Sequence, residues 1–183
     1  MSAIFDDFPV PATQVPGDFA KNGQTLSIFL EPAGIVAAAG YMKDKEYFIE
    51  DVTGLDLAEG FCVLYHFAHF EKPGRVTLRL LASRDNPVVP SIAGVYGGAQ
   101  WHERETRDFY GIAFEGNPND GPLLLADEET TPPLLKDDAK RAVLQKAWPY
   151  AAMGVNPVPA AKPAPAAKPV AAKPATPAPE VTK

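Results

Sequence analysis

The sequence predicts a compact two-layer α+β domain with a mixed β-sheet and a few helices, followed by an extended C-terminal segment and a disordered tail. Predicted strands and helices interleave without the βαβ repeat of a doubly wound sheet. Glycine and proline become frequent after residue 114, and the last 28 residues contain eight prolines and no aromatic residue. We therefore expect an N-terminal extension over 1–24, an α+β domain over 25–113, an extended segment over 114–155 and an Ala/Pro/Lys-rich disordered tail over 156–183.

The first half of the expected domain reads as strand, helix, strand. Residues 25–30 have the composition of a short strand. Pro32 suits the first turn of a helix that runs to about Lys43, because its fixed φ and missing N–H are tolerated there. Residues 47–52 then read as a further strand.

Two longer strands follow, joined by a hairpin turn. Residues 60–70 are rich in aromatic and β-branched side chains, and apolar residues alternate along 75–81. The intervening EKPG, residues 71–74, is typical hairpin chemistry. The sequence therefore predicts two strands joined as a hairpin.

The later elements are less regular. A short helix or turn is expected near Pro90, a helix over 100–110 that ends at Gly111, and a further short helix within 136–146. Prolines and glycines interrupt the chain from 114 to 149. A long irregular segment in a small domain is unusual unless it has a function, such as lying across a partner.

Charge and cysteine content restrict the class of protein. The net charge is −6, with the tail carrying +3 and the remainder −9, so an acidic domain without a basic stripe argues against nucleic acid as a ligand. Cys62 is the single cysteine, which argues against a disulfide or an iron–sulfur cluster in this chain. The first residues do not resemble a secretory signal, and the longest apolar stretch is about half the ~20 residues of a membrane-spanning helix. Membrane association is therefore expected only through partners.

Cys62, His66 and His69 have a spacing that superficially resembles a metal site. Side chains alternate along a strand, so Cys62 and His66 share one face while His69 points to the other. We interpret them as a core thiol and two ordinary histidines, and predict no metal site.

The densest polar stretch reads WHERETRDFYGIAFEG, from 101 to 116. On a helix, Glu103 with Arg107 and Arg104 with Asp108 would form i,i+4 ion pairs. Glu105 and Asp108 could form a general acid–base pair, although the neighbouring arginines would keep both ionised. Aromatic residues interleave with these charges, which is typical of protein–protein interfaces. An interface is therefore favoured over a solvated helix or a catalytic pair.

This stretch resembles the signature W-x-E-R-E-x-x-D-[LMF]-[FY]-G-I-x-F-x-G of the thirty-kilodalton subunit family of NADH-quinone oxidoreductase (respiratory complex I). Downstream, residues 133–137 read PLLKD and resemble the family's P-L-R-K-D. Upstream, the family's F-x-x-L-x-D-[LV]-[TS]-x-x-D is matched in part by residues 47–56. The resemblance covers roughly residues 25–140.

The resemblance implies a subunit without catalytic residues or cofactors of its own, in the hydrophilic arm of a proton-pumping oxidoreductase. Its expected partners are the hydrogenase-like large subunit that helps form the quinone site, the small iron–sulfur subunit and other subunits of the arm. Iron–sulfur clusters, flavin and quinone are expected in the partners. The expected location is the cytoplasmic face of the bacterial inner membrane, as a peripheral protein. The predicted partner interface comprises Trp101, Glu103, Arg104, Glu105, Asp108, Phe109, Tyr110, Gly111, Phe114, Gly116, Pro133, Lys136 and Asp137.

The chain departs from the family pattern where positive charge is usual. Asn117 replaces a histidine, Gly121 and Pro122 replace a basic pair, and Leu135 replaces an arginine. An alternative is therefore the equivalent subunit of a membrane-bound, energy-converting hydrogenase. A remote alternative is a stand-alone hydrolase that uses two acids of the helix.

Overall fold

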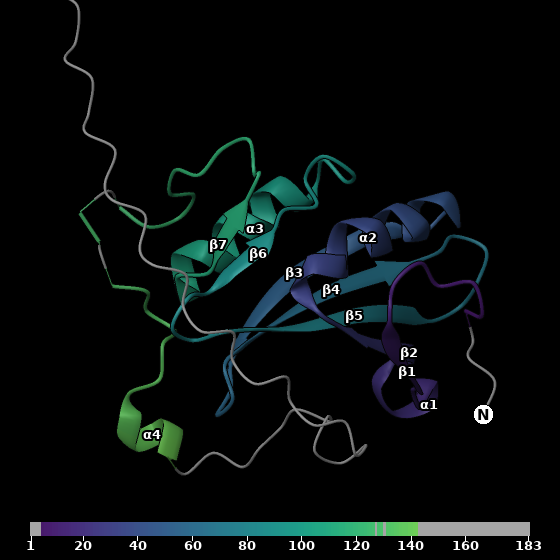
Figure 1. The fold of residues 1–183 in the computed structure, drawn as a ribbon, viewed down its shortest axis with the longest axis horizontal. Coiled ribbons are helices and arrows are strands. Elements are labelled where there is room, and N and C mark those ends of the chain that lie inside the picture. Colours follow the sequence, from purple (N-terminus) through teal and green to yellow (C-terminus); the bar gives the residue numbers. More distant parts are fainter. Residues whose placement is uncertain (1–4, 127, 130, 143–183) are drawn as a thin grey trace, which may run out of the picture.

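The structure is a computed structural model that describes residues 5–126, 128, 129 and 131–142. Its main element is a five-stranded sheet in the order β1-β2-β5-β4-β3 (Figure 1). Strands β2 and β5 are parallel, and the other neighbouring pairs in this sheet are antiparallel. The mixed sheet confirms the predicted α+β class. The strands are β1 (Ala12–Pro16), β2 (Gln24–Leu30), β3 (Phe48–Asp56), β4 (Phe61–Ala68) and β5 (Arg75–Ala82).

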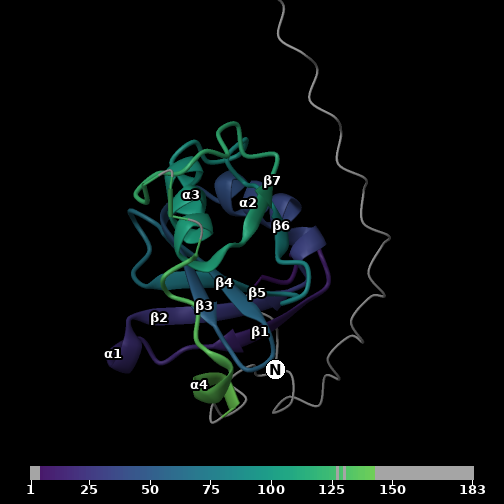
Figure 2. The same cartoon turned by 90° about the vertical axis from the view of Figure 1, so that its left-hand side faces the viewer.

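A second layer covers one face of this sheet. It contains the helices α2 (Ile35–Asp44) and α3 (Ala99–Tyr110), as Figures 1 and 2 show. A short parallel pair, β6 (Val88–Pro90) and β7 (Ala113–Glu115), lies beside α3. The layer therefore places α3 next to β3, which is an edge strand of the sheet.

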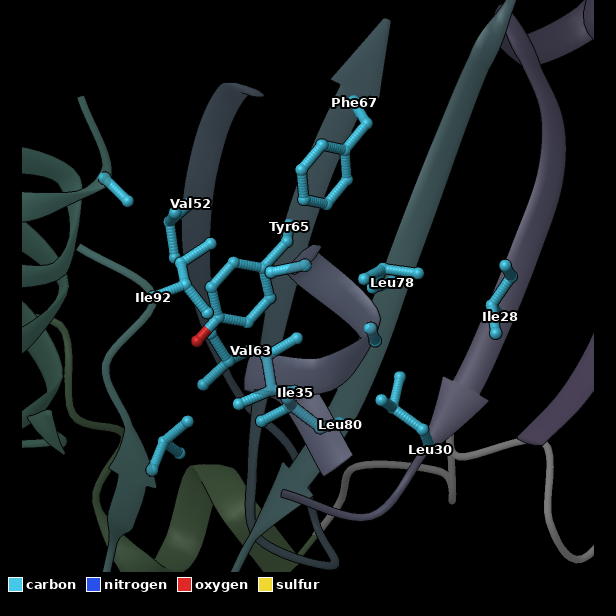
Figure 3. Packing of buried hydrophobic residues seen from close by; sticks show 14 of the residues in the cluster. Ile28, Leu30, Ile35, Val52, Val63, Tyr65, Phe67, Leu78, Leu80 and Ile92 are labelled. Atoms are coloured by element: carbon cyan, nitrogen blue, oxygen red, sulfur yellow. The ribbon is translucent and has the colours of Figure 1, made fainter. Parts of the chain in front are cut away.

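The core forms between these layers. Alternate residues of each strand point to the helices, so Tyr65 and Phe67 of β4 pack near Leu78 of β5 and Ile28 of β2 (Figure 3). Ile35 of α2 completes this cluster, and all five side chains are essentially inaccessible to water. Alternating apolar strands and one apolar helix stripe thus form the main core, and Phe29, Cys62 and Leu64 form a second, smaller cluster.

Several predicted boundaries shift slightly in the structure. The segment from Pro32 starts as a short 3₁₀ turn, η1 (Pro32–Gly34), before α2 begins. Strand β3 extends four residues beyond the predicted strand end, to Asp56. The predicted hairpin is confirmed, because β4 and β5 pair antiparallel on either side of residues 71–74.

Four short elements were not predicted, namely β1, α1, β6 and β7. Strand β1 pairs with β2, so part of the segment expected to precede the domain belongs to its sheet. A four-residue helix, α1 (Phe19–Asn22), connects the two strands. The turn expected to begin near Pro90 is confirmed, because the N–H groups of Val95 and Tyr96 donate to the carbonyl of Ile92, whereas strand β6, which ends at Pro90 and pairs with β7, was not predicted. Both β1 and β6 are short and contain proline at their ends, so no alternation reveals them.

The last described element is α4 (Asp138–Ala142), within the range where a short helix was expected. Residues 136 and 137 precede this helix, and residues 143–146 of the predicted helix and the predicted tail lie outside the described residues. The four-part division of the chain stays a prediction.

Candidate functional site: helix α3 and the segment it binds

Helix α3 carries the charged signature and ends where the sequence predicted. Gly111 has φ +72° and donates its N–H to the carbonyl of Arg107 at 2.7 Å. Glycine adopts this left-handed conformation without steric cost. The chain can therefore turn directly from α3 into β7.

Glu103 is fully buried and anchors α3 to two loops. Its carboxylate accepts hydrogen bonds from the Ser91 hydroxyl at 2.5 Å, the Ile92 N–H at 2.8 Å and the Asn117 side-chain amide at 2.7 Å. Burial raises the pKa of Glu103, and these three hydrogen bonds oppose the rise. The carboxylate thus joins the segments that follow β6 and β7.

The prediction of ion pairs along α3 was wrong. Among the described residues, Glu103 has no ion pair with Arg107, and Arg104 has none with Asp108. Instead, both acids accept hydrogen bonds from neutral donors, and Arg107 keeps one buried nitrogen without a hydrogen-bond partner. The i,i+4 rule applies to exposed helix faces, whereas these acids are buried and face other segments.

Arg104 and Asp108 both bind the segment that follows β7. Arg104 donates from Nε to the carbonyl of Gly121 at 3.0 Å and from Nη2 to that of Pro122 at 2.5 Å. Asp108 Oδ2 accepts the backbone N–H groups of residues 123–125 at 2.8–3.2 Å. Burial alone would raise the pKa of Asp108, but these N–H groups and the charge of Arg104 lower it. Two successive turns of α3 therefore fix five consecutive residues.

Asp56, at the end of β3, binds the same segment farther along. Its Oδ2 accepts the N–H of Lys136 at 2.9 Å, and its backbone carbonyl accepts Lys136 Nζ at 2.5 Å. Arg84 pairs with Oδ1 at 2.7 Å. Burial alone would raise the pKa of Asp56, but the hydrogen bonds from Arg84 and Lys136 and the charge of Arg141 lower it.

We call residues 117–126 and 131–141 the strap. The strap crosses from α3 past β3 to α4 (Figure 2). Between its two polar attachments, the N–H of Leu134 donates to the carbonyl of Phe109 at 3.1 Å. The PLLKD sequence therefore lies against the end of α3 and the end of β3, within the chain itself.

The aromatic residues of the signature separate into buried and exposed groups. Phe114 belongs to the core, whereas Trp101 is 64% exposed. Phe109 and Tyr110 are half-buried at the end of α3. The Tyr110 ring lies so close to Gly54 that a Cβ there would come within 2.5 Å of it. Gly54 thus allows α3 to approach β3.

The other predicted interface residues are spread over the strap and its flanks. Glu105, Pro133 and Asp137 are not buried, and Gly116 has φ +90° in the turn after β7. Glu103, Asp108 and Phe114 are buried within the chain. That these residues contact a partner stays a prediction.

The three residues with metal-like spacing have separate surroundings. Cys62 is buried, and burial raises the pKa of its thiol to about 12. His66 lies 3.3 Å from the Thr77 hydroxyl, and His69 Nδ1 accepts the N–H of Glu71 in the hairpin turn. Within the part of the chain that the structure describes, no group of three His, Cys, Asp or Glu residues is arranged to hold a metal ion.

Sequence reasoning missed the partners of the charged residues. Ser91 and Asn117 bind Glu103, and Arg84 binds Asp56. No local spacing connects these residues, because the contacts bridge 12 to 28 positions. The one feature of the sequence that pointed to any of these partners was Asn117, which departs from the family pattern.

In the described ranges, no helix is both long and apolar enough to cross a membrane.

The fold and site define a small α+β domain whose charged helix binds its own C-terminal strap. Two solved structures share this fold, each at under 25% sequence identity. A trypsin-resistant fragment of Nqo5 has a TM-score of 0.52 and 24% identity over 59% of this chain and 89% of its own. A chain of an archaeal membrane-bound sulfane sulfur reductase has a TM-score of 0.55 and 20% identity over 88% of this chain and 92% of its own.

Sequence comparison identifies the family. Residues 28–143 match the family described as the respiratory-chain NADH dehydrogenase 30 Kd subunit, and the chain belongs to it. A NADH-quinone oxidoreductase subunit from Roseiflexus sp. (strain RS-1) is 35% identical over 61% of this chain and 68% of its own length. The equally named subunit from Xanthobacter autotrophicus is 36% identical over 67% of this chain and 61% of its own length. The resemblance found in the sequence is confirmed.

Proposed function

We propose that the chain is a non-catalytic, structural subunit of the hydrophilic arm of a proton-pumping NADH-quinone, or related donor-quinone, oxidoreductase. In this role it supports assembly of the large subunit that contributes the quinone site. The observation that carries the proposal is the family match over residues 28–143, which includes most of the sheet, α3 and the strap.

The contacts of the strap support a role in assembly. Five consecutive strap residues bind Arg104 and Asp108, and Lys136 binds Asp56. A segment held in one conformation loses less entropy on binding than a free segment. The strap therefore offers a pre-formed surface to a partner subunit.

The proposal assigns the cofactors to other subunits. Clusters, flavin and quinone would be held by partners, among them a hydrogenase-like large subunit and a small iron–sulfur subunit. The chain would lie at the cytoplasmic face of the bacterial inner membrane and attach to it through these partners.

A second candidate is the equivalent subunit of an energy-converting hydrogenase. It is favoured by the departures from the family pattern, all of which lie in the strap. Asn117 binds Glu103, and the carbonyls of Gly121 and Pro122 bind Arg104. Only Asn117 uses its side chain in these contacts, and the strap surface carries less positive charge than the usual family pattern would give.

A stand-alone hydrolase has less support. Asp108 Oδ2 already accepts three backbone N–H groups, and its pKa is lowered. A carboxylate in that state is a poor general acid at neutral pH. Glu105 would therefore lack the partner that this hypothesis requires.

Affinity purification of the tagged full-length chain from detergent-solubilised membranes tests the proposal. We expect to recover a hydrogenase-like large subunit, a small iron–sulfur subunit and antiporter-like membrane proteins, identified by mass spectrometry. NADH-binding subunits in the sample would support complex I, and hydrogenase cysteine motifs in the large subunit would support the alternative. Recovery of the chain alone would contradict both.

A further inference from the structure

One face of α3 is contacted by the strap only at its C-terminal end, where the N–H of Leu134 donates to the carbonyl of Phe109. Trp101, Glu105 and Phe109 are spaced four residues apart, so they form one stripe along the helix. Trp101 is 64% exposed and Glu105 is exposed, whereas the strap contacts use Arg104 and Asp108. Trp101 and Glu105 are therefore accessible in the isolated chain, and Phe109 is accessible in part.

A hollow of about 170 Å³ lies next to this stripe, between α3 and the edge strand β3. Phe109, Tyr110 and Leu134 provide its apolar lining, and Leu134 is 50% exposed. Glu105 and Asp51 contribute carboxylates to the lining. An apolar hollow with charged groups beside it is typical of a site where one anchor side chain of a partner is inserted.

The charge of this face is not balanced within the chain. In the described part of the chain, neither Glu105 nor Asp51 forms an ion pair with a lysine or arginine. The partners of Asp51 are the Thr53 hydroxyl and His102 Nδ1, the latter at 3.2 Å. The arginines of α3, Arg104 and Arg107, line a different hollow. A complementary partner must therefore supply positive charge.

We propose that this face binds an arginine-bearing apolar segment of the large partner subunit. The guanidinium stacks on Trp101 and pairs with Glu105, and a neighbouring apolar side chain enters the hollow at Phe109 and Leu134. Arginine is favoured over lysine because its planar group both stacks on an indole and forms a paired contact with a carboxylate. This inference rests on the proposed function, because it requires a partner subunit.

Photo-crosslinking in the assembled complex tests the contact directly. Trp101→p-benzoylphenylalanine keeps an aromatic side chain at the stripe, and the tagged full-length chain is irradiated after purification with its partners. We expect an adduct with one peptide of the large subunit that contains arginine. An adduct with a peptide free of arginine, or no adduct in a complete complex, would overturn the inference.

Charge reversal supplies the second measurement. We expect Glu105→Lys to reduce recovery of the large subunit about tenfold at physiological salt, the effect of losing one favourable charge pair. Glu115→Lys is the matched control, because Glu115 is also exposed and lies away from the stripe, and it should behave as the unmodified chain. Circular dichroism melting of the free variants checks that both fold.

The outcomes separate this inference from the function that it extends. Full recovery of the complex with Glu105→Lys would reject the arginine contact while leaving the proposed function intact. Failure of the unmodified chain to recover any respiratory subunit would reject both.

Discussion

The sheet core and the strap are held by contacts of different kinds. In the core, buried apolar side chains such as Ile28, Leu78 and Phe67 pack over a wide area. At the strap, Asp56 and Asp108 bind backbone N–H groups with a few atoms. Apolar burial is non-directional and distributed, whereas hydrogen bonds depend on specific positions. Damage to the core should therefore unfold the domain, and damage to an anchor should release the strap alone.

The largest expected effect is in the core. Leu78→Ala removes a fully buried side chain from the centre of the sheet and should lower the free energy of unfolding by about 2–5 kcal/mol. Leu124→Ala, at a 60% exposed strap residue, is the matched control and should change it by less than about 0.5 kcal/mol. Equilibrium denaturation in urea measures both, and equal effects would contradict the comparison.

A smaller effect is expected where β3 contacts α3, the helix that binds the strap. In Gly54→Ala, the added Cβ would lie 2.5 Å from Cδ2 of Tyr110, so the Tyr110 ring or helix α3 must shift away from β3. We expect a loss of about 1–3 kcal/mol, as for other overpacked sites. Gly40→Ala is the control, because its Cβ meets nothing within 4 Å in helix α2, and it should stabilise by about 0.5–1 kcal/mol. Thermal melting of both variants distinguishes steric conflict from a general effect of alanine.

Removing an anchor of the strap should act locally. Asp108→Ala leaves three N–H groups of residues 123–125 without their acceptor, which should cost about 1–2 kcal/mol of local stability because water replaces the carboxylate in part. Limited proteolysis should become faster in the strap, and the urea midpoint of the sheet should move little. Asp120→Ala, at an exposed residue, is the control. Cooperative loss of the whole domain in Asp108→Ala would show that strap and core are one unit.

The smallest expected effect depends on pH. The pKa values of Asp56 and Asp108 are lowered in the folded chain, so both groups stabilise it above their unfolded pKa of about 3.9. This stabilisation should be lost as the pH falls below about 4 and through the folded pKa values. Glu103 has the opposite effect on the pH dependence of stability. Because its pKa is raised in the folded chain, acidification favours the folded state at this residue.

Hydrogen exchange at several pH values checks this effect. Strap amides of residues 123–125 should begin to lose protection as the pH falls below about 4, before the amides of β4 and β5 do. Asp108→Asn, which does not titrate, should remove most of this pH dependence. Strap amides that lose protection only together with those of β4 and β5 would contradict the role of the two carboxylates.

The difference between the apolar core and the hydrogen-bonded strap also explains which features could be predicted from the sequence. Alternating apolar residues along 75–81 reveal β5, and Gly111 marks the end of α3, because both signals are local. The destinations of Glu103 and Asp108 could not be predicted, since their partners are loop donors brought together by the fold. Charge spacing alone indicated ion pairs, and it was wrong because burial turns both acids away from the exposed helix face.

The family resemblance indicated which residues matter without indicating how they act. It singled out Lys136, whose contact with Asp56 spans 80 positions. It could not distinguish Trp101, which is exposed, from Phe114, which is part of the core. A family signature therefore combines intramolecular and accessible positions, and the three-dimensional structure separates them.

The position of the strap in the chain has a consequence for biosynthesis. A protein leaves the ribosome from its N-terminus, so β3 and α3 are available before the strap that binds them. The pairing of Lys136 with Asp56 cannot form until both distant parts exist. Strap closure is thus a late step that marks a nearly finished domain. A partner that recognises the closed strap would discriminate against incomplete copies before they enter the complex.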